Sequence, residues 1–176
     1  MTETVIETSY GPLGLMILKP ETATLENPAP CVVACHGSYN SKEMQSPAMV
    51  ELSRRGVVVV SLDMFCHGHS ANAESLVYID NHKGGYYNVE TGEFVSDKAQ
   101  ATAINAHGII EAVEYVYSSL GYVDRERIGV TGHSMGGVSS TNAVRYYHNV
   151  STLLEEPQKI TSAFFQSCTL AACCQC

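Results

Sequence analysis

The stretch RIGVTGHSMGG, residues 127–137, decides the fold of this chain. Residues 127–131 are rich in apolar and β-branched side chains, a composition typical of a buried strand. Residues 134–148 are typical of a helix. Ser134 stands where the two elements meet, in the pattern G-x-S-x-G, so the sequence predicts a strand, a tight turn at the serine and a helix.

The glycines at 132 and 136 make such a turn possible. A strained strand-to-helix turn brings two backbones close together, and glycine has no side chain to obstruct them. The turn would expose the Ser134 hydroxyl and direct the backbone N–H of Met135, at a helix N-terminus, toward the same space. The pattern therefore favours a nucleophilic serine over the alternative, a glycine-rich turn with an incidental serine.

Other apolar runs predict a sheet with helices between its strands. Alternating strand and helix patterns favour a parallel sheet with right-handed crossovers, and Ser134 is expected at the carboxyl end of the third strand. The predicted parallel strands are 31–36, 57–62, 127–131 and 160–166. The predicted helices run from Asn40 or Ser41 to about Arg55, with Gly56 after the last turn, and from 98 to 120, while strands 4–9 and 13–19 form an antiparallel hairpin at the sheet edge.

Residues 63–98 are expected to form a long irregular excursion between two sheet strands, and they include Tyr78, Tyr86, Tyr87 and Phe94. Loops of this length are uncommon in compact domains unless they are lids or binding loops. The excursion leaves the sheet on the side where open α/β sheets bind substrates, which favours a substrate-facing cap. The alternative is a solvated surface loop whose aromatic side chains pack locally.

Three segments of the chain resemble the α/β-hydrolase superfamily, in the order that the family has. CVVACHGS, residues 31–38, resembles the strand that ends in His-Gly. VVVVSLD, residues 57–63, followed by HGHS, residues 67–70, resembles the D-x-x-G-H-G-x-S turn. Residues 123–137 resemble the serine segment of dienelactone-hydrolase-like, acetyl-esterase-like and serine-aminopeptidase-like members. The resemblance implies an α/β-hydrolase fold, a mostly parallel sheet with helices on both faces.

The resemblance also implies a chemistry, acyl transfer to water. Ser134 would attack an ester, thioester or amide carbonyl of a small-molecule acyl substrate and form an acyl-enzyme. The backbone N–H groups of Met135 and Ser38 would hold the oxyanion, with Tyr39 as the alternative to Ser38. His36 would shape this oxyanion loop and would not act as the base.

Histidines near the motifs allow competing interpretations. Asp63, His67 and His69 could form a metal cluster, but one carboxylate with an H-x-H pair is a weak signal, and the family counterpart is a structural turn. His133 is adjacent to the serine on a sharp turn, where neighbouring side chains point apart, so a packing role is expected. Cys66 stands where the family pattern has its first glycine, so the local backbone there is expected to differ. No metal and no cofactor are expected.

The partners of Ser134 are the main departure from the family, whose triad runs Ser, then Asp or Glu, then His. After Ser134 the sequence has no Asp, and its only later acids and histidine are Glu155, Glu156 and His148. A continuous helix would place His148 about 21 Å from Ser134, at about 1.5 Å per residue. The triad acid and base are therefore predicted to be missing, in an incomplete domain over residues 1–167 that lacks the last strands of the fold.

Composition excludes some function classes. The chain has 176 residues, enough for one domain, and 10 basic against 18 acidic residues give a formal charge of −8. Nucleic acid and anionic membranes need a basic patch, so neither is an expected partner. No apolar run approaches the roughly 20 residues that span a bilayer, and no apolar secretory segment is evident near Met1. A cytoplasmic location is expected.

Seven cysteines divide into two groups. Cys31, Cys35 and Cys66 lie in or beside predicted core strands, where buried thiols are common. The other four are crowded into the last nine residues: Cys168, Cys173, Cys174 and Cys176. Thiolates are good zinc ligands, but adjacent cysteines are awkward ones, so the segment 168–176 is interpreted as a non-native or disordered tail.

Three functional hypotheses remain from the sequence. The first is a serine hydrolase with Ser134 as nucleophile. The second is a catalytically inactive fragment or binding module that keeps the fold, and the third is a thiol-metal protein centred on the tail. An incomplete sheet would expose a strand edge, expected at 160–166, through which the chain could associate with itself.

Overall fold

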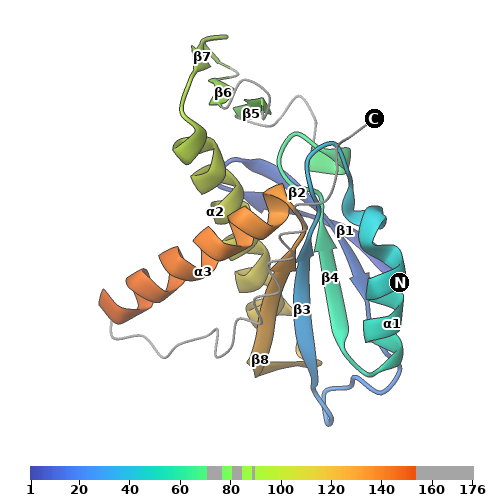
Figure 1. Cartoon of the computed structure of the whole chain (residues 1–176). Helices are drawn as coiled ribbons and strands as arrows, with labels where there is room; N and C mark the ends of the chain where they lie inside the picture. The colour runs from blue at the N-terminus through green and yellow to red at the C-terminus, as the bar shows by residue number, and fades with distance from the viewer. Residues whose placement is uncertain (71–76, 81–84, 89, 154–176) are drawn as a thin grey trace.

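The computed structural model describes residues 1–70, 77–80, 85–88 and 90–153 (Figure 1). Two sheets and three α-helices make up this part of the chain. The strands are β1 (Thr2–Thr8), β2 (Gly11–Leu18), β3 (Ala29–Cys35), β4 (Val58–Leu62), β5 (Val77–Asp80), β6 (Gly85–Asn88), β7 (Phe94–Val95) and β8 (Val123–Gly132). The helices are α1 (Ser46–Arg54), α2 (Lys98–Ser119) and α3 (Met135–Leu153), with two short 3₁₀ helices, η1 (Lys42–Gln45) and η2 (Gly68–Ser70).

The larger sheet has the strand order β1-β2-β4-β3-β8. β3 pairs in parallel with both β4 and β8, whereas β2 pairs antiparallel with β1 and β4. Four of these five strands therefore run in one direction and β2 alone opposes them. The predicted hairpin, its place at the edge and the parallel set formed by β3, β4 and β8 are confirmed. The fourth predicted strand, 160–166, lies outside the described residues, as does the tail 168–176.

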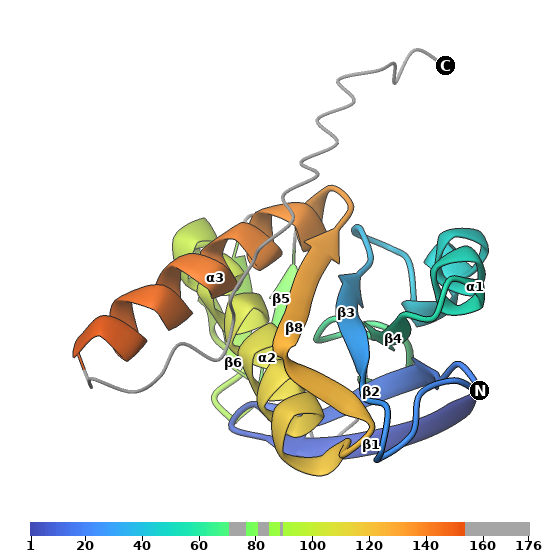
Figure 2. The same cartoon turned by 90° about the horizontal axis from the view of Figure 1, so that it is seen from below.

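Helices cover both faces of this sheet (Figure 2). Strand side chains alternate between the faces. On one face, Leu15, Val33 and Val60 belong to a core that includes Ile104 and Ile109 of α2 and Ala143 of α3. On the other face, Ala34 and Val59 pack with Met49 of α1. The apolar runs of the sequence thus form two cores, and the sheet is a buried middle layer.

The helix predicted between Asn40 and Arg55 begins later than the sequence indicates. The 3₁₀ helix η1 occupies residues 42–45, and α1 begins only at Ser46. Ser41 precedes η1 but makes no capping bond, because its hydroxyl binds the Glu43 carboxylate. The predicted end is correct, since α1 stops at Arg54 and Gly56 has a φ of +86°, the left-handed conformation that favours glycine.

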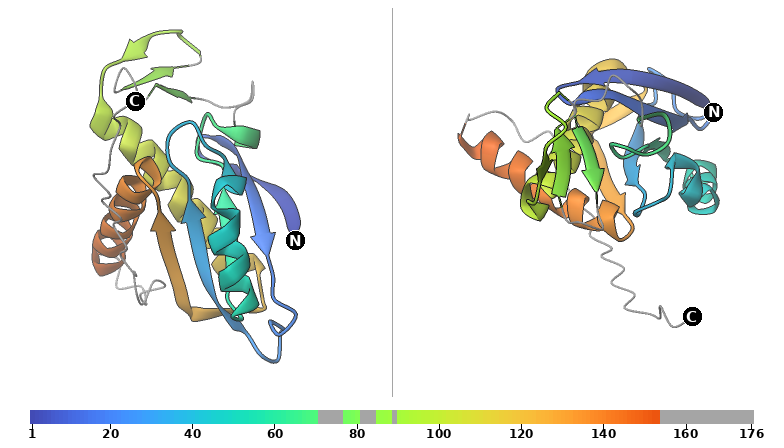
Figure 3. Two further views of the ribbon diagram at one scale, coloured as in Figure 1. Left: turned by 45° about the vertical axis from the view of Figure 1, so that its right-hand side comes forward. Right: turned by 90° about the horizontal axis from the view of Figure 1, so that it is seen from above.

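The excursion over residues 63–98 contains structure that its sequence did not indicate. Strands β5, β6 and β7 form a small antiparallel sheet near the start of α2, at the end of the molecule where β3, β4 and β8 terminate (Figures 1 and 3). Tyr86 packs against the main core, and the Tyr87 and Phe94 rings contact each other with centroids 4.9 Å apart. The described residues of the excursion thus include a small sheet, and a substrate-facing role stays a prediction.

The long helix after it agrees with its predicted bounds to within one residue, since α2 covers Lys98–Ser119. Asp97, which sequence analysis did not single out, caps this helix by accepting a hydrogen bond from the Gln100 N–H at 2.9 Å. Within the described residues, no helix is both long and apolar enough to cross a membrane. The cytoplasmic location stays a prediction.

Candidate functional site

The predicted site centres on the serine turn, residues 132–137, which joins β8 to α3. β8 ends at Gly132 and α3 begins at Met135, so His133 and Ser134 form the connection. Ser134 has a φ of +50°, in the left-handed region that non-glycine residues seldom adopt, and it is exposed. Such strain persists only where the surroundings over-determine the backbone, and it is common at functional sites.

Close approach of three backbone segments enforces this turn. A Cβ atom on Gly136 would lie 2.4 Å from the carbonyl oxygen of Cys35, and one on Gly132 would lie 2.3 Å from the carbonyl carbon of Gly136. The His133 N–H donates to the Cys35 oxygen at 3.1 Å. The glycines predicted from the sequence are therefore required by the packing of the turn against the end of β3.

The predicted oxyanion loop, residues 37–39, lies beside the serine turn. A Cβ atom on Gly37 would be 2.8 Å from His133 Nδ1 and 3.4 Å from the Ser134 Cβ. The structure thus brings Ser134, Met135 and the loop that contains Ser38 to one place. It also places the His133 imidazole beside Gly37, although His133 is exposed, so its packing role stays a prediction.

His36 connects this loop to the turn after β4. It is 1% exposed, its Nε2 accepts a hydrogen bond from the Met64 N–H at 2.9 Å, and its Nδ1 lies 2.6 Å from the Gly37 oxygen. Burial is the largest influence on this imidazole and lowers its pKa, and nearby His67 acts in the same direction. His36 is therefore a neutral structural group.

His67 makes a second connection between the same two segments. Its Nδ1 lies 2.9 Å from the Phe65 oxygen, and its Nε2 accepts a hydrogen bond from the Tyr39 N–H at 3.1 Å. The His36 and His67 rings contact edge to face, with centroids 5.0 Å apart. In this structure the Tyr39 N–H is thus engaged by His67, which favours Ser38 over Tyr39 as the second oxyanion donor.

Asp63 has the structural role that its motif predicts. It is fully buried, and its carboxylate accepts hydrogen bonds from the N–H groups of Lys42 at 2.8 Å and His69 at 2.9 Å. Its own N–H and C=O bind Gly14 and Ser70. In the part of the chain that the structure describes, no group of three His, Cys, Asp or Glu side chains is arranged to hold a metal ion.

Lys42 is a buried ion-pair partner that sequence analysis missed. Its side chain is 1% exposed, and its Nζ lies 3.0 Å from Asp63 and 2.8 Å from the half-exposed Glu43. Hydrogen bonds from Lys42 and Ser41 lower the pKa of Glu43 to about 2. Burial acts to lower the pKa of Lys42, but its two carboxylate partners outweigh that effect and raise it.

The cysteines of the strands are buried thiols. Burial raises the pKa of Cys31 and Cys35, so neither is a reactive thiolate near neutral pH. Cys66 has a φ of +67°, in the left-handed region that favours glycine, the residue that the motif usually has at this position. The expected difference of the local backbone from that of the family stays a prediction.

The described residues offer no imidazole within hydrogen-bonding contact of the Ser134 hydroxyl that could act as its base. Across the described residues, no hydrogen bond joins the Ser134 hydroxyl to an imidazole. α3 continues without interruption past residue 148, so helical rise separates His148 from Ser134 by about 21 Å along the axis. Glu155 and Glu156 lie outside the described residues.

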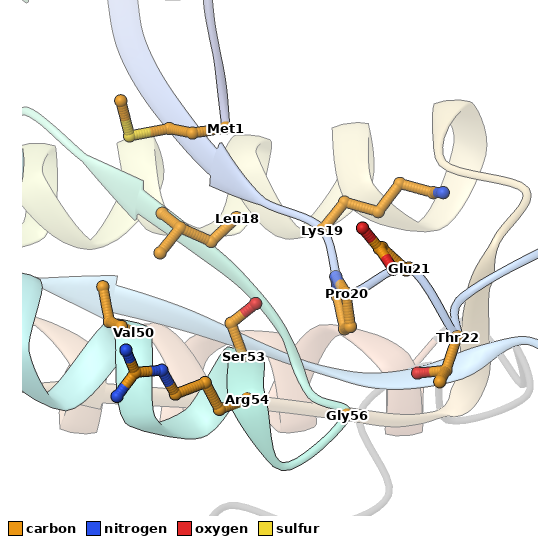
Figure 4. A pocket seen from close by; sticks show the side chains of 10 residues that line it. All are labelled: Met1, Leu18, Lys19, Pro20, Glu21, Thr22, Val50, Ser53, Arg54 and Gly56. Atoms are coloured by element: carbon orange, nitrogen blue, oxygen red, sulfur yellow. The ribbon is translucent and has the colours of Figure 1, made fainter.

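A cavity of about 490 Å³ lies at the opposite end of the sheet (Figure 4). It is lined by residues from the end of β2, including Leu18 and Lys19, and from the end of α1, including Ser53 and Arg54. Gly56, which also lines it, precedes β4, whereas Ser134 follows the carboxyl end of β8. This cavity is therefore separate from the predicted site.

A mostly parallel sheet covered by helices on both faces, with a strained serine turn at the carboxyl ends of its strands, defines the α/β-hydrolase class. A family model described as acetyl xylan esterase (AXE1) matches residues 13–151, most of the chain. The chain belongs to this acetyl xylan esterase family. A search of curated proteins gives no match.

Solved structures that resemble this chain in fold include several esterases. A hyperthermophilic esterase from the archaeon Pyrobaculum calidifontis shares 19% identity with a TM-score of 0.59, over 90% of this chain and 41% of its own. Est1E from Butyrivibrio proteoclasticus, solved with ferulic acid, shares 18% identity with a TM-score of 0.58, over 84% and 49%. A bacterial heroin esterase shares 17% identity with a TM-score of 0.58, over 85% and 40%. The chain spans about two fifths to one half of the length of these proteins.

Proposed function

We propose that this chain carries the nucleophile and oxyanion elements of an esterase that acts on small acyl esters. The description of its family favours an acetyl ester as the substrate. The observation that carries the proposal is the exposed Ser134 at a φ of +50°, next to the 37–39 loop. The proposal assigns no base to Ser134, because no hydrogen bond in the described part of the chain joins its hydroxyl to an imidazole.

In the proposed reaction, Ser134 Oγ bonds to the ester carbonyl carbon and its proton passes to a base. The carbonyl oxygen becomes an oxyanion, and the N–H groups of Met135 and Ser38 donate hydrogen bonds to it. The alcohol then leaves with a proton, and water hydrolyses the acyl-enzyme. Without an adjacent base a serine hydroxyl is a poor nucleophile, so turnover by this chain alone should be slow.

The experiment is covalent labelling by a fluorophosphonate, followed by mass spectrometry of the peptide. Because no base is assigned to Ser134, we expect slow labelling on prolonged incubation, with one adduct, on Ser134, and none in Ser134→Ala. Ser139→Ala is a matched control, because Ser139 is a buried serine of the same helix and should leave labelling unchanged. Failure of the wild-type chain to react at Ser134 would contradict the proposal and favour an inactive fragment or binding module.

A further inference from the structure

Two consecutive peptide groups of the 37–39 loop are each bound by a different histidine. The Gly37 oxygen, from the first peptide group, lies 2.6 Å from His36 Nδ1. The Tyr39 N–H, from the second, donates to His67 Nε2 at 3.1 Å. Ser38 lies between these two bonds, so its backbone is restrained on both sides.

The hydrogen bonds also assign the tautomer of each ring. His36 Nε2 accepts from the Met64 N–H, so its Nδ1 carries the hydrogen and donates it to Gly37. His67 Nε2 accepts from the Tyr39 N–H, so its Nδ1 carries the hydrogen and donates it to Phe65. Each histidine therefore connects the loop to residues 64–65, which follow β4. One ring nitrogen of each histidine binds the loop, and the other binds residue 64 or 65.

Peptide planarity converts these bonds into the direction of the Ser38 N–H. The C=O of Gly37 and the N–H of Ser38 belong to one planar trans group and point in opposite directions. Holding the Gly37 oxygen at His36 therefore turns the Ser38 N–H away from His36. Tyr39 has a φ of +60°, a conformation that is unfavourable for tyrosine, and its bond to His67 opposes relaxation of the loop.

From this geometry we propose that His67 is a positioning residue, which holds the Ser38 N–H in the direction needed for an oxyanion by binding the next amide, that of Tyr39. The inference rests on the proposed esterase function and deepens it. His67 acts through the loop and does not touch the substrate. The sequence placed His67 in a structural turn 28 residues from Tyr39, with no indication of this contact.

The test compares His67→Gln with His67→Asn in the full chain, by the rate of fluorophosphonate labelling at Ser134. A glutamine oxygen can reach the place of Nε2 and accept the Tyr39 N–H, whereas an asparagine reaches only the place of Nδ1. We expect His67→Asn to lower the maximal labelling rate about 10- to 100-fold without changing the reagent concentration for half-maximal rate. We expect His67→Gln to stay within about threefold of wild type, as a rescue by the variant that keeps the acceptor.

His69→Asn is the control, because that imidazole is largely exposed and its Nδ1 lies 3.4 Å from Lys42 Nζ and 3.7 Å from the Glu3 carboxylate. Thermal unfolding of all variants separates a positioning effect from general destabilisation. Labelling of His67→Asn at the wild-type rate would overturn the inference and leave the proposed function intact. If labelling slows equally in both His67 variants, in proportion to their loss of stability, the inference is also overturned, because His67 would then have a purely structural role. A wild-type chain that does not react at Ser134 would overturn both.

Discussion

Replacing Lys42 by methionine should cost a large share of the stability of the fold. The change removes the ammonium that lies 3.0 Å from a fully buried carboxylate, Asp63, and keeps a side chain of similar length. At an effective dielectric constant of about 20, the attraction across 3.0 Å is roughly 5.5 kcal/mol. Removing one partner of a buried pair typically costs about 3–5 kcal/mol, because the remaining charge is buried without compensation.

In this variant the Asp63 carboxylate still accepts hydrogen bonds from the backbone N–H groups of residues 42 and 69. We therefore expect a loss of stability of about 3 kcal/mol, at the lower end of the range for a broken buried pair. Urea unfolding followed by circular dichroism measures the effect. With a slope of about 2 kcal/mol per molar urea, a loss of 3 kcal/mol moves the midpoint down by about 1.5 M. Glu43→Gln is the matched control, since it removes the half-exposed partner of the same ammonium and should cost at most about 1 kcal/mol.

If Lys42→Met proves too unstable to study, the double variant Lys42→Met with Asp63→Asn removes both charges. It should be more stable than Lys42→Met alone, because no uncompensated charge is left in the interior. A Lys42→Met protein within about 1 kcal/mol of wild type, or no less stable than Glu43→Gln, would refute the reasoning.

Three further predictions concern the same end of the sheet and its edge. Gly136→Ala should destabilise the fold by at least about 2 kcal/mol and abolish labelling, because the added carbon meets the Cys35 carbonyl oxygen at 2.4 Å; an unchanged urea midpoint would contradict this. Glu43, whose pKa is lowered from 4.5 to about 2, should contribute stability that is present above about pH 4.5 and lost as the pH falls toward 2, so Glu43→Gln should flatten that limb in an acid titration of stability. β8 is the last strand in the described sheet, and its edge should promote self-association that light scattering detects as a concentration-dependent rise in mass; a monomer at all concentrations would count against it.

The strands and the long helix could be predicted because the burial of their side chains determines the spacing of apolar residues in the sequence. The valines 57–60 and the run 31–35 are continuous apolar segments, and strands covered on both faces have that composition. The spacing of apolar residues over 98–120 fits one helical face. These signals are local, so they can be read from neighbouring residues.

The parts that the sequence could not predict depend on contacts between distant residues. Lys42 follows a polar segment, and its sequence neighbours are typical of the start of a surface helix. Its buried ion pair depends on Asp63, which is 21 positions later in the sequence. The Tyr39–His67 bond is of the same kind. The small sheet of β5–β7 was not predicted, because its strands are only two to four residues long and lack the alternation that indicates a strand.

Strained backbone is concentrated at one end of the molecule. Among the described residues, the non-glycine positions with positive φ are Tyr39, Cys66 and Ser134, and they follow β3, β4 and β8 in turn. Each such conformation costs of order 1–3 kcal/mol, and the contacts of this end outweigh that cost in the folded protein. Opening this end releases the strain, so it should open at a lower free-energy cost than the cores under α1 and α2. Loss of the proposed activity on heating should therefore precede unfolding of the sheet, and the working temperature of this protein would be set by three residues at the strand ends and not by its melting point.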